Sequence, residues 1–304
     1  MSGQTPQFGD LSIGKAAADE FVRLPRYPAL FEIRAARMKT LAAANPAAGF
    51  LGLMVRVFSA QADASLLAGE VVPPSAEAIA RAREHAMPPI ATDSWVPTAT
   101  YRAALRFIAA NISRDGLPQA TIDVLAGLGE APDEHLDNLA RAHLESAIPP
   151  HWQGEAIFAV AALQVEFARI ASLLPKEAIK PLDAPGLCPC CGSPPVAGVV
   201  VADHAFGRRF LSCGLCSTSW HYVRVACITC GTEKDVAYQE IEGGDGVAKC
   251  ESCDDCRTYS KIFYQQKNMA VEALCDDLAT LSLDLMVNNA GWKRHAPNPF
   301  VPVI

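Results

Sequence analysis

Pairs of cysteines with the spacing Cys-x-x-Cys occur four times between residues 188 and 256. The first two pairs are separated by 21 residues and the last two by 22, so one unit is written twice. Two cysteines three positions apart can direct both sulfur atoms at one tetrahedral ion, and a second pair completes a four-thiolate site. The chain is therefore predicted to hold two metal ions, one per unit. The expected ligands are Cys188, Cys191, Cys213 and Cys216 for the first ion, and Cys227, Cys230, Cys253 and Cys256 for the second.

A four-sulfur site lacks the open coordination position that a catalytic zinc ion keeps for water. The predicted centres therefore favour a structural or electron-transfer role over hydrolysis. Zinc and iron both accept tetrahedral thiolates, so the sequence leaves both metals open. An interleaved pairing of the four cysteine pairs also stays open, although it would require the two units to cross.

Three cysteines are left over. Cys190 lies inside the first pair, and Cys275 lies in a predicted helix, where a packing role is favoured over a ligand role. Cys250 could pair with Cys253 and displace Cys256, but only the choice of Cys256 preserves the repeat. Disulfides are a further alternative, which would leave the duplicated three-residue spacing unexplained.

The composition restricts the class of protein. Half of the 304 residues are hydrophobic, which is enough for a sizeable core, and the net charge of -7 argues against a nucleic-acid binder. The first ten residues contain neither a basic n-region nor an apolar h-region, and no stretch of about 18 apolar residues occurs. We therefore expect a soluble, cytoplasmic protein with no membrane insertion. Residues 1–20 are expected to be loosely ordered.

The first half of the chain has a helical hydrophobic period. Tyr101, Leu105 and Ile108 are spaced to line one face of a helix, and residues 155–174 are apolar almost all round. We expect this second segment to be the central buried helix. Helix starts are expected at Pro28, Ser75 and Pro132.

Beyond a proline-rich connector at residues 175–185, the period changes to two, which indicates strands. Residues 220–225 alternate as in a strand, and Gly243–Gly246 is predicted to be a hairpin loop. A last helix with one apolar stripe is predicted from Val271 to Leu285.

These patterns predict an α+β fold, with an N-terminal all-helical domain, two tandem ribbon-like metal-binding modules and a C-terminal helix. The expected parts are residues 1–180, 181–225, 226–266 and 267–304.

Several other side chains have a structural and a functional interpretation. His204 and His221 are expected to pack or to be exposed rather than to ligate, and Trp220 and Tyr222 are expected to pack in the core.

The charged residues of the second half are harder to place. Arg224 and Lys261 either face solvent or pair with the charge of a sulfur centre or with a partner. Asp276 and Asp277 are expected to be solvent-exposed, because adjacent residues of a helix point about 100° apart.

A set of motifs gives the chain a family resemblance. They are Pro28-Ala-Leu-Phe31-Glu-Ile-Arg34, Cys188-Pro-Cys-Cys191-Gly-Ser-Pro-Pro195, Cys213-Gly-Leu-Cys216-Ser-Thr-Ser-Trp220-His, Val223-Arg-Val-Ala-Cys227-Ile-Thr-Cys230, Glu251-Ser-Cys253-Asp-Asp-Cys256-Arg-Thr-Tyr259-Ser-Lys261, Asp276-Asp277-Leu-Ala and Asn298-Pro-Phe300. In this order they resemble the formate dehydrogenase accessory protein family, FdhE, from about residue 22 to 300.

The resemblance implies a cytoplasmic, non-enzymatic factor needed to make active respiratory formate dehydrogenases. Such a factor contacts the catalytic, molybdenum- or tungsten-containing subunit without joining the finished enzyme. It also implies rubredoxin-like metal modules at the eight matching cysteines. A homodimer stays open. The competing hypotheses are a thiol–disulfide or electron-transfer oxidoreductase and a zinc-ribbon nucleic-acid module, which the acidic balance disfavours.

Overall fold

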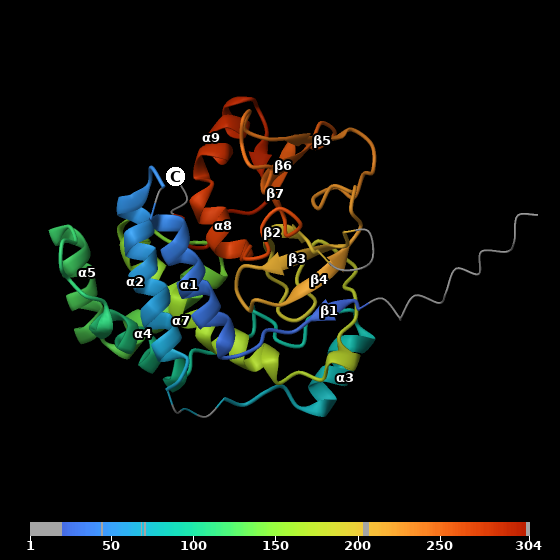
Figure 1. The fold of residues 1–304 in the computed structure, drawn as a ribbon. Helices are drawn as coiled ribbons and strands as arrows, with labels where there is room; N and C mark the ends of the chain where they lie inside the picture. The colour runs from blue at the N-terminus through green and yellow to red at the C-terminus, as the bar shows by residue number, and fades with distance from the viewer. Residues whose placement is uncertain (1–19, 44, 68, 70, 203–206, 302–304) are drawn as a thin grey trace, which may run out of the picture.

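A computed structural model describes residues 20–301 apart from 44, 68, 70 and 203–206. Helices from the first half of the chain form one lobe, and the strands form a second lobe beside it (Figure 1). One hydrophobic core runs continuously from the helices into the sheet. The α+β fold class expected from the sequence is confirmed.

The helical lobe is built around one buried helix. This helix, α7, packs against α2, α4, α5 and α6, and most of its length is buried, as the apolar segment at 155–174 predicts. The lobe comprises α1 (Ala29–Ala42), α2 (Ala48–Ala64), α3 (Ala76–Glu84), α4 (Ala99–Asn111), α5 (Gln119–Glu130), α6 (Asp133–Leu144) and α7 (Gln153–Ser172), with short 3-10 turns η1 (Pro150–Trp152) and η2 (Lys176–Ala178).

Helix starts fall where the sequence predicts them. Pro28 and Pro132 immediately precede α1 and α6, and the Ser75 hydroxyl accepts the Ala78 N–H at the start of α3. Tyr101, Leu105 and Ile108 all point from α4 into the core.

The two cysteine units join into one sheet. Strand order is β1-β4-β3-β2-β7-β6-β5, with β8 beside β7. Each unit contributes an antiparallel ribbon, and the parallel pairing of β2 with β7 connects them. The strands are β1 (Val22–Arg23), β2 (Pro195–Val200), β3 (Arg209–Cys213), β4 (Ser219–Tyr222), β5 (Val236–Gln239), β6 (Ala248–Cys253), β7 (Thr258–Tyr264) and β8 (Lys293–Arg294).

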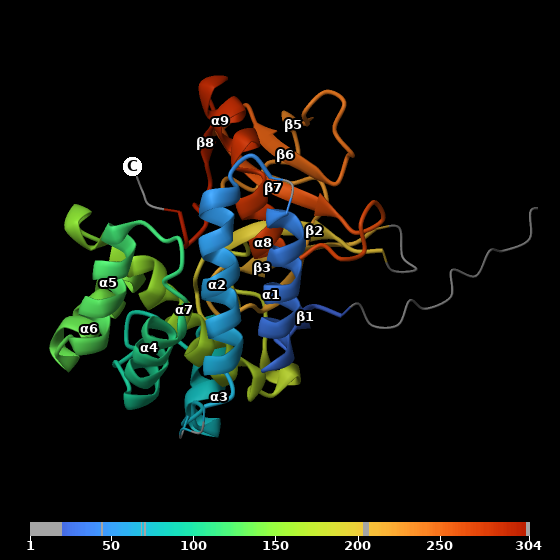
Figure 2. The same cartoon turned by 60° about the vertical axis from the view of Figure 1, so that its left-hand side comes forward.

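The N-terminal end of the described chain completes this sheet. In β1, Val22 pairs with Trp220 of β4, so the sheet lobe includes a strand from the helical half of the sequence. Figure 2 shows β1 leading directly into α1 beside the sheet. The hairpin loop at Gly243–Gly246 lies between β5 and β6, as predicted. The strand predicted at 220–225 ends at Tyr222.

The predicted single C-terminal helix is wrong. Two helices, α8 (Ala273–Ala279) and α9 (Leu281–Asn289), meet at Thr280. The buried Lys261 ammonium donates to the carbonyls of Asp277 and Thr280, at 2.7 and 3.2 Å, and so satisfies groups that a continuous helix would have used itself. Because of the break, Leu285 is 65% exposed instead of continuing the apolar stripe.

Candidate metal centres

The first cysteine group lies between the β2 and β3–β4 segments and is fully enclosed. Cys188 and Cys191 come from the loop before β2, and Cys213 and Cys216 from the turn between β3 and β4. The four Sγ atoms lie within 4.8 Å of one another, and all four residues are buried. The Sγ atoms of Cys188 and Cys216 lie 3.5 Å apart, and those of Cys191 and Cys213 also lie 3.5 Å apart.

The second group repeats this arrangement at the other ribbon, but nearer to solvent. Its members are Cys227, Cys230, Cys253 and Cys256, whose Sγ atoms also lie within 4.8 Å of one another. The Cys227–Cys256 and Cys230–Cys253 sulfurs are 3.6 and 3.7 Å apart. Cys230 is exposed and Cys256 half-buried.

The spacing of the sulfur atoms fits a tetrahedral ion. A tetrahedron with metal–sulfur bonds of about 2.3 Å has edges of about 3.8 Å, close to the distances in both groups. A disulfide would need sulfurs about 2.05 Å apart, and the cysteines of both groups are free thiols in this structure. The structure thus brings together the same two sets of four that the sequence pairs, without interleaving.

The turns that hold the sulfurs are alike in the two units. Gly192 and Gly231, which follow the second cysteine of each unit, have φ of 77° and 75°. This left-handed conformation favours glycine because it has no side chain to clash. Ser217 and Arg257 adopt φ of 60° and 56° directly after the fourth cysteine of each unit.

Backbone amides in these turns point at sulfur. Leu215 and Cys216 N–H donate to Cys213 Sγ at 3.3 and 3.4 Å, and Thr229 N–H donates to Cys227 Sγ at 3.4 Å. Such donors stabilise the thiolate form. Burial opposes ionisation of Cys227, but the N–H groups of Cys230 and Thr229 lower its pKa to about 7.

The leftover residues lie outside both groups. Cys250 packs beside Tyr259, and burial raises its pKa to about 12. Cys275 is buried against α1, where its Sγ contacts the Arg34 carbonyl at 3.3 Å. His221 packs edge-on against Phe210. Trp220 and Tyr222 are buried, which confirms the prediction that they pack in the core. His204 lies outside the described residues.

A buried polar network joins the first group to the helices. Gln164 of α7 donates to the carbonyl of Gly214, between two cysteines of the group, at 2.6 Å. Arg34 of α1 donates to Gln164 Oε1 and to Ser217 Oγ, both at 3.0 Å, and pairs with Glu272. The first group is therefore fastened to two helices through its own turn. Sequence reasoning missed this network, because the partners of Gln164 lie far from it in the sequence.

The expectation that Asp276 and Asp277 are solvent-exposed is wrong. Asp276 is 4% exposed and pairs with Arg37 of α1, and Asp277 is fully buried beside Lys261 and Arg294. The helix that carries both acids, α8, is enclosed between α1 and the sheet. The two carboxylates therefore point in different directions and still both face protein.

Lys261 is also buried, so the solvated face that the sequence left open as one of two alternatives is wrong for this residue. Its ammonium lies 3.1 Å from Asp277 Oδ1 and 2.6 Å from Asp284 Oδ2, and no sulfur centre or partner is involved in these contacts. Burial alone would raise the pKa of Asp277, but Lys261 and Arg294 lower it below its ordinary value. Arg224, by contrast, is exposed.

A further buried ion pair connects the two cysteine units. Arg209 of β3 lies 2.9 Å from Glu251 of β6, and both side chains are almost completely buried. Tyr238 also donates to Glu251, at 3.1 Å. Burial raises the pKa of the Glu251 carboxyl, and the charge of Arg209 opposes this.

Comparison with known proteins places this architecture in a family. Three sequence models match consecutive parts of the chain: "FdhE, N-terminal" over residues 19–184, "FdhE, central domain" over 187–224 and "FdhE, C-terminal domain" over 225–301. The chain belongs to the FdhE family. The family resemblance inferred from the motifs is thus confirmed.

Individual FdhE proteins are similar along nearly the whole chain. A Protein FdhE homolog of Rhizobium meliloti is 33% identical over 292 residues, which cover 95% of each chain. One from Edwardsiella ictaluri is 36% identical over 91% of this chain and 90% of its own. The crystal structure of the FdhE protein from Pseudomonas aeruginosa superposes with a TM-score of 0.82 at 31% identity, covering 92% and 98% of the two chains.

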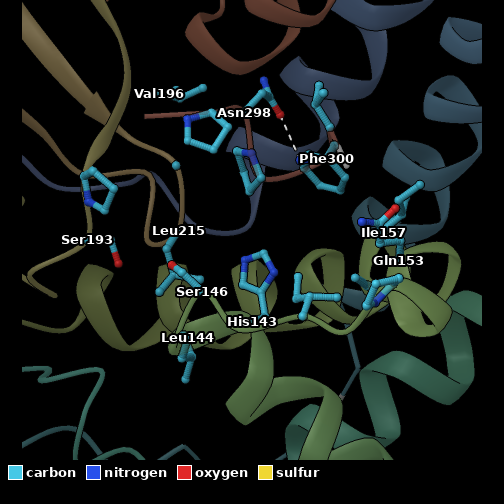
Figure 3. Close-up of a pocket in the computed structure, with 18 residues that line it drawn as sticks. His143, Leu144, Ser146, Gln153, Ile157, Ser193, Val196, Leu215, Asn298 and Phe300 are labelled. Atoms are coloured by element: carbon cyan, nitrogen blue, oxygen red, sulfur yellow. Dashed lines mark hydrogen bonds between the residues drawn. The ribbon is translucent and has the colours of Figure 1, made fainter. Parts of the chain in front are cut away.

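Beside the first cysteine group, this FdhE-family chain has a pocket of about 550 Å³ (Figure 3). It is lined by Leu215, between Cys213 and Cys216, by His143 at the end of α6, and by Phe300 near the C-terminal end of the described chain. Of the described residues that line it, His143 is the one acidic or basic side chain, and burial lowers the pKa of His143 to about 4. Within the described residues, no helix is both long and apolar enough to cross a membrane.

Proposed function

We propose that this chain is a cytoplasmic accessory protein for the formation of active respiratory formate dehydrogenase. The observation that supports this proposal is the pair of four-cysteine groups within a chain that matches the FdhE family from residue 19 to 301. In this proposal the chain docks on the catalytic subunit, assists its maturation or adjusts its redox state, and is not itself an enzyme.

In this proposal the eight cysteines hold two ions. The residues are Cys188, Cys191, Cys213 and Cys216 for one, and Cys227, Cys230, Cys253 and Cys256 for the other. Zinc would supply a structural cross-link, and iron would add a one-electron couple. The chain's own contribution is to direct backbone N–H groups at the sulfurs and to keep the first group dry.

The test of the proposal is genetic and biochemical. Deletion of the gene should abolish respiratory formate oxidation, and the tagged protein should retain the formate dehydrogenase catalytic subunit in a pull-down. Normal formate oxidation in the deletion strain would contradict it. Metal analysis and an optical spectrum of protein purified without oxygen would distinguish iron from zinc, because ferric thiolate absorbs visible light.

A thiol–disulfide or electron-transfer oxidoreductase is the second candidate. The exposure of Cys230 and the pKa of about 7 at Cys227 favour it. Its cysteine pairs, however, lie in loops and turns next to strands, whereas catalytic pairs of this spacing usually begin a helix. Insulin reduction at a catalytic rate would support this function over the accessory role.

A further inference from the structure

The two cysteine groups differ in how firmly the rest of the chain holds them. All four residues of the first group are buried, with exposures of 0% to 4%. In the second group Cys230 is exposed and Cys256 is half-buried. The difference does not come from the ligand set, because both groups have four cysteines in similar turns.

Contacts from three directions enclose the first group. Gln164 of α7 donates to Gly214, and Ile90 N–H donates to the Cys190 carbonyl at 2.9 Å. Pro299, next to Phe300, lies beside Gly214, where an added Cβ would be in van der Waals contact with its ring at 3.5 Å. Opening this group would therefore separate the helices from the sheet.

The described residues cover the second group less than the first. Apart from its two chain neighbours, none of them has an atom within 4 Å of the Cβ position at Gly231, next to Cys230. Two hydrogen bonds restrain the Cys227–Cys230 loop from other elements. The Tyr222 hydroxyl of β4 donates to the Cys227 carbonyl at 3.0 Å, and Thr229 Oγ1, nearer to Cys230, lies 2.8 Å from His295 Nδ1. The backbone N–H of His295 donates to the Tyr259 carbonyl at 2.8 Å, which holds His295 in place.

The same threonine is connected to the sulfurs. Thr229 Oγ1 lies 2.9 Å from Thr258 Oγ1, which is 3.0 Å from Cys256 Sγ. The position equivalent to Thr229 in the first unit is Cys190, which is buried and has no hydroxyl. The His295–Thr229 contact is therefore a feature of the second unit alone.

We propose that the first group keeps its ion as a permanent cross-link, whereas the second exchanges its ion with outside thiols through Cys230. The Thr229–His295 hydrogen bond limits the rate of this exchange. In the exchange, an incoming thiol loses its proton and takes the place of Cys230, whose sulfur accepts the proton, so the number of sulfur ligands is unchanged. The inference rests on the metal binding in the proposed function.

The test uses the full chain loaded with cadmium, whose NMR spectrum gives one resonance for each four-thiolate ion. Excess of a small dithiol should remove one ion at least about tenfold faster than the other. C230S should hold one ion only and should show the slow phase alone. The near-UV circular dichroism should be unchanged after the first ion leaves.

The role of the Thr229–His295 hydrogen bond is tested by side-chain substitution. T229V and H295L should each speed the fast phase about threefold, as expected for one partly exposed hydrogen bond, and leave the slow phase unchanged. The double variant should be no faster than either single variant, because both remove the same bond. T229S keeps the hydroxyl and should restore the original rate, which also controls for misfolding.

Several outcomes would overturn the inference. They are release of both ions at one rate, loss of the slow phase instead of the fast one in C230S, additive effects in the double variant, and an unchanged fast phase in T229V. A chain that binds no ion at all would instead contradict the proposed function, so the two failures are distinguishable.

Discussion

At the scale of single residues, the two groups of sulfurs differ in environment although their chemistry is identical. Cys213 is buried in a turn fastened to the helices, and Cys230 is exposed at the end of the other ribbon. Removing a ligand should therefore have unequal consequences for the stability of the chain.

The first prediction compares C213S with C230S. Each variant should lose one of two bound ions, but only C213S should destabilise the whole chain, because an unfilled buried site leaves thiols and a hydroxyl without their ion. We expect a lowering of the melting temperature by roughly 10 °C or more for C213S and by a few degrees for C230S. Elemental analysis and differential scanning calorimetry measure both effects. Equal destabilisation by the two variants would count against this difference.

The second prediction concerns acid stability and His143. Burial lowers the pKa of His143 to about 4, against 6.5 for an ordinary histidine. Between these pH values the unfolded chain binds more protons than the folded one. The free energy of unfolding is therefore unaffected by His143 above pH 6.5 and falls as the pH is lowered from 6.5 toward 4. In H143L this acid-induced loss of the free energy of unfolding should be smaller by about 1–2 kcal/mol. This figure is reduced for solvent screening, because the ring is half-buried.

Urea unfolding of metal-loaded protein at pH 7 and pH 5 checks this prediction. The comparison of H143L with the unaltered chain cancels the protonation of the cysteines, which is common to both. Parallel pH dependence in the two proteins would show that His143 titrates as an ordinary histidine.

At the scale of elements, α8 is stabilised by buried charges rather than by an apolar stripe alone. Its two adjacent carboxylates point in different directions, Asp276 toward Arg37 of α1 and Asp277 toward Lys261 of β7. A single short helix thus connects the helical lobe to the sheet.

The third prediction concerns this ion cluster. D277N removes one charge beside Lys261 and Arg294 and should lower the free energy of unfolding by about 3 kcal/mol, because two buried cations lose a partner. D254N is the matched control, since the Asp254–Arg257 pair is more than half exposed and should contribute less than about 1 kcal/mol. Urea denaturation of both variants decides the matter. A loss in D277N no larger than in D254N would mean that the cluster does not stabilise the fold.

At the scale of the whole molecule, the helices and the sheet share one core and a polar junction at the first cysteine group. Unfolding of the helical lobe and loss of the first ion should therefore occur together. The division at residues 180, 225 and 266 predicted from the sequence stays a prediction.

The fourth prediction tests this junction with Q164L. The change removes the donor to Gly214 and the acceptor for Arg34 and Gln61, all in the buried interior. It should destabilise the chain by about 2–4 kcal/mol and weaken binding of the first ion only. The same substitution at the exposed Gln119 should change stability by less than about 0.5 kcal/mol. Thermal unfolding followed by circular dichroism, with metal release recorded in parallel, measures the coupling.

The sequence by itself determined the local features of this protein. Cysteine spacing predicted two groups of four, and a segment that is apolar almost all round predicted α7. Proline and serine marked the starts of α1, α3 and α6. These features depend on contacts within a few residues, or on a repeat that is visible in the chain itself.

Only the tertiary structure decided which polar residues are buried and what they contact. Asp276, Asp277, Lys261 and Gln164 meet partners that lie far away in the sequence, so no local pattern distinguishes them from exposed residues. The unequal burial of the two cysteine groups has the same cause. It depends on which ribbon the helical lobe packs against, and this is set by the shared core rather than by the cysteine spacing.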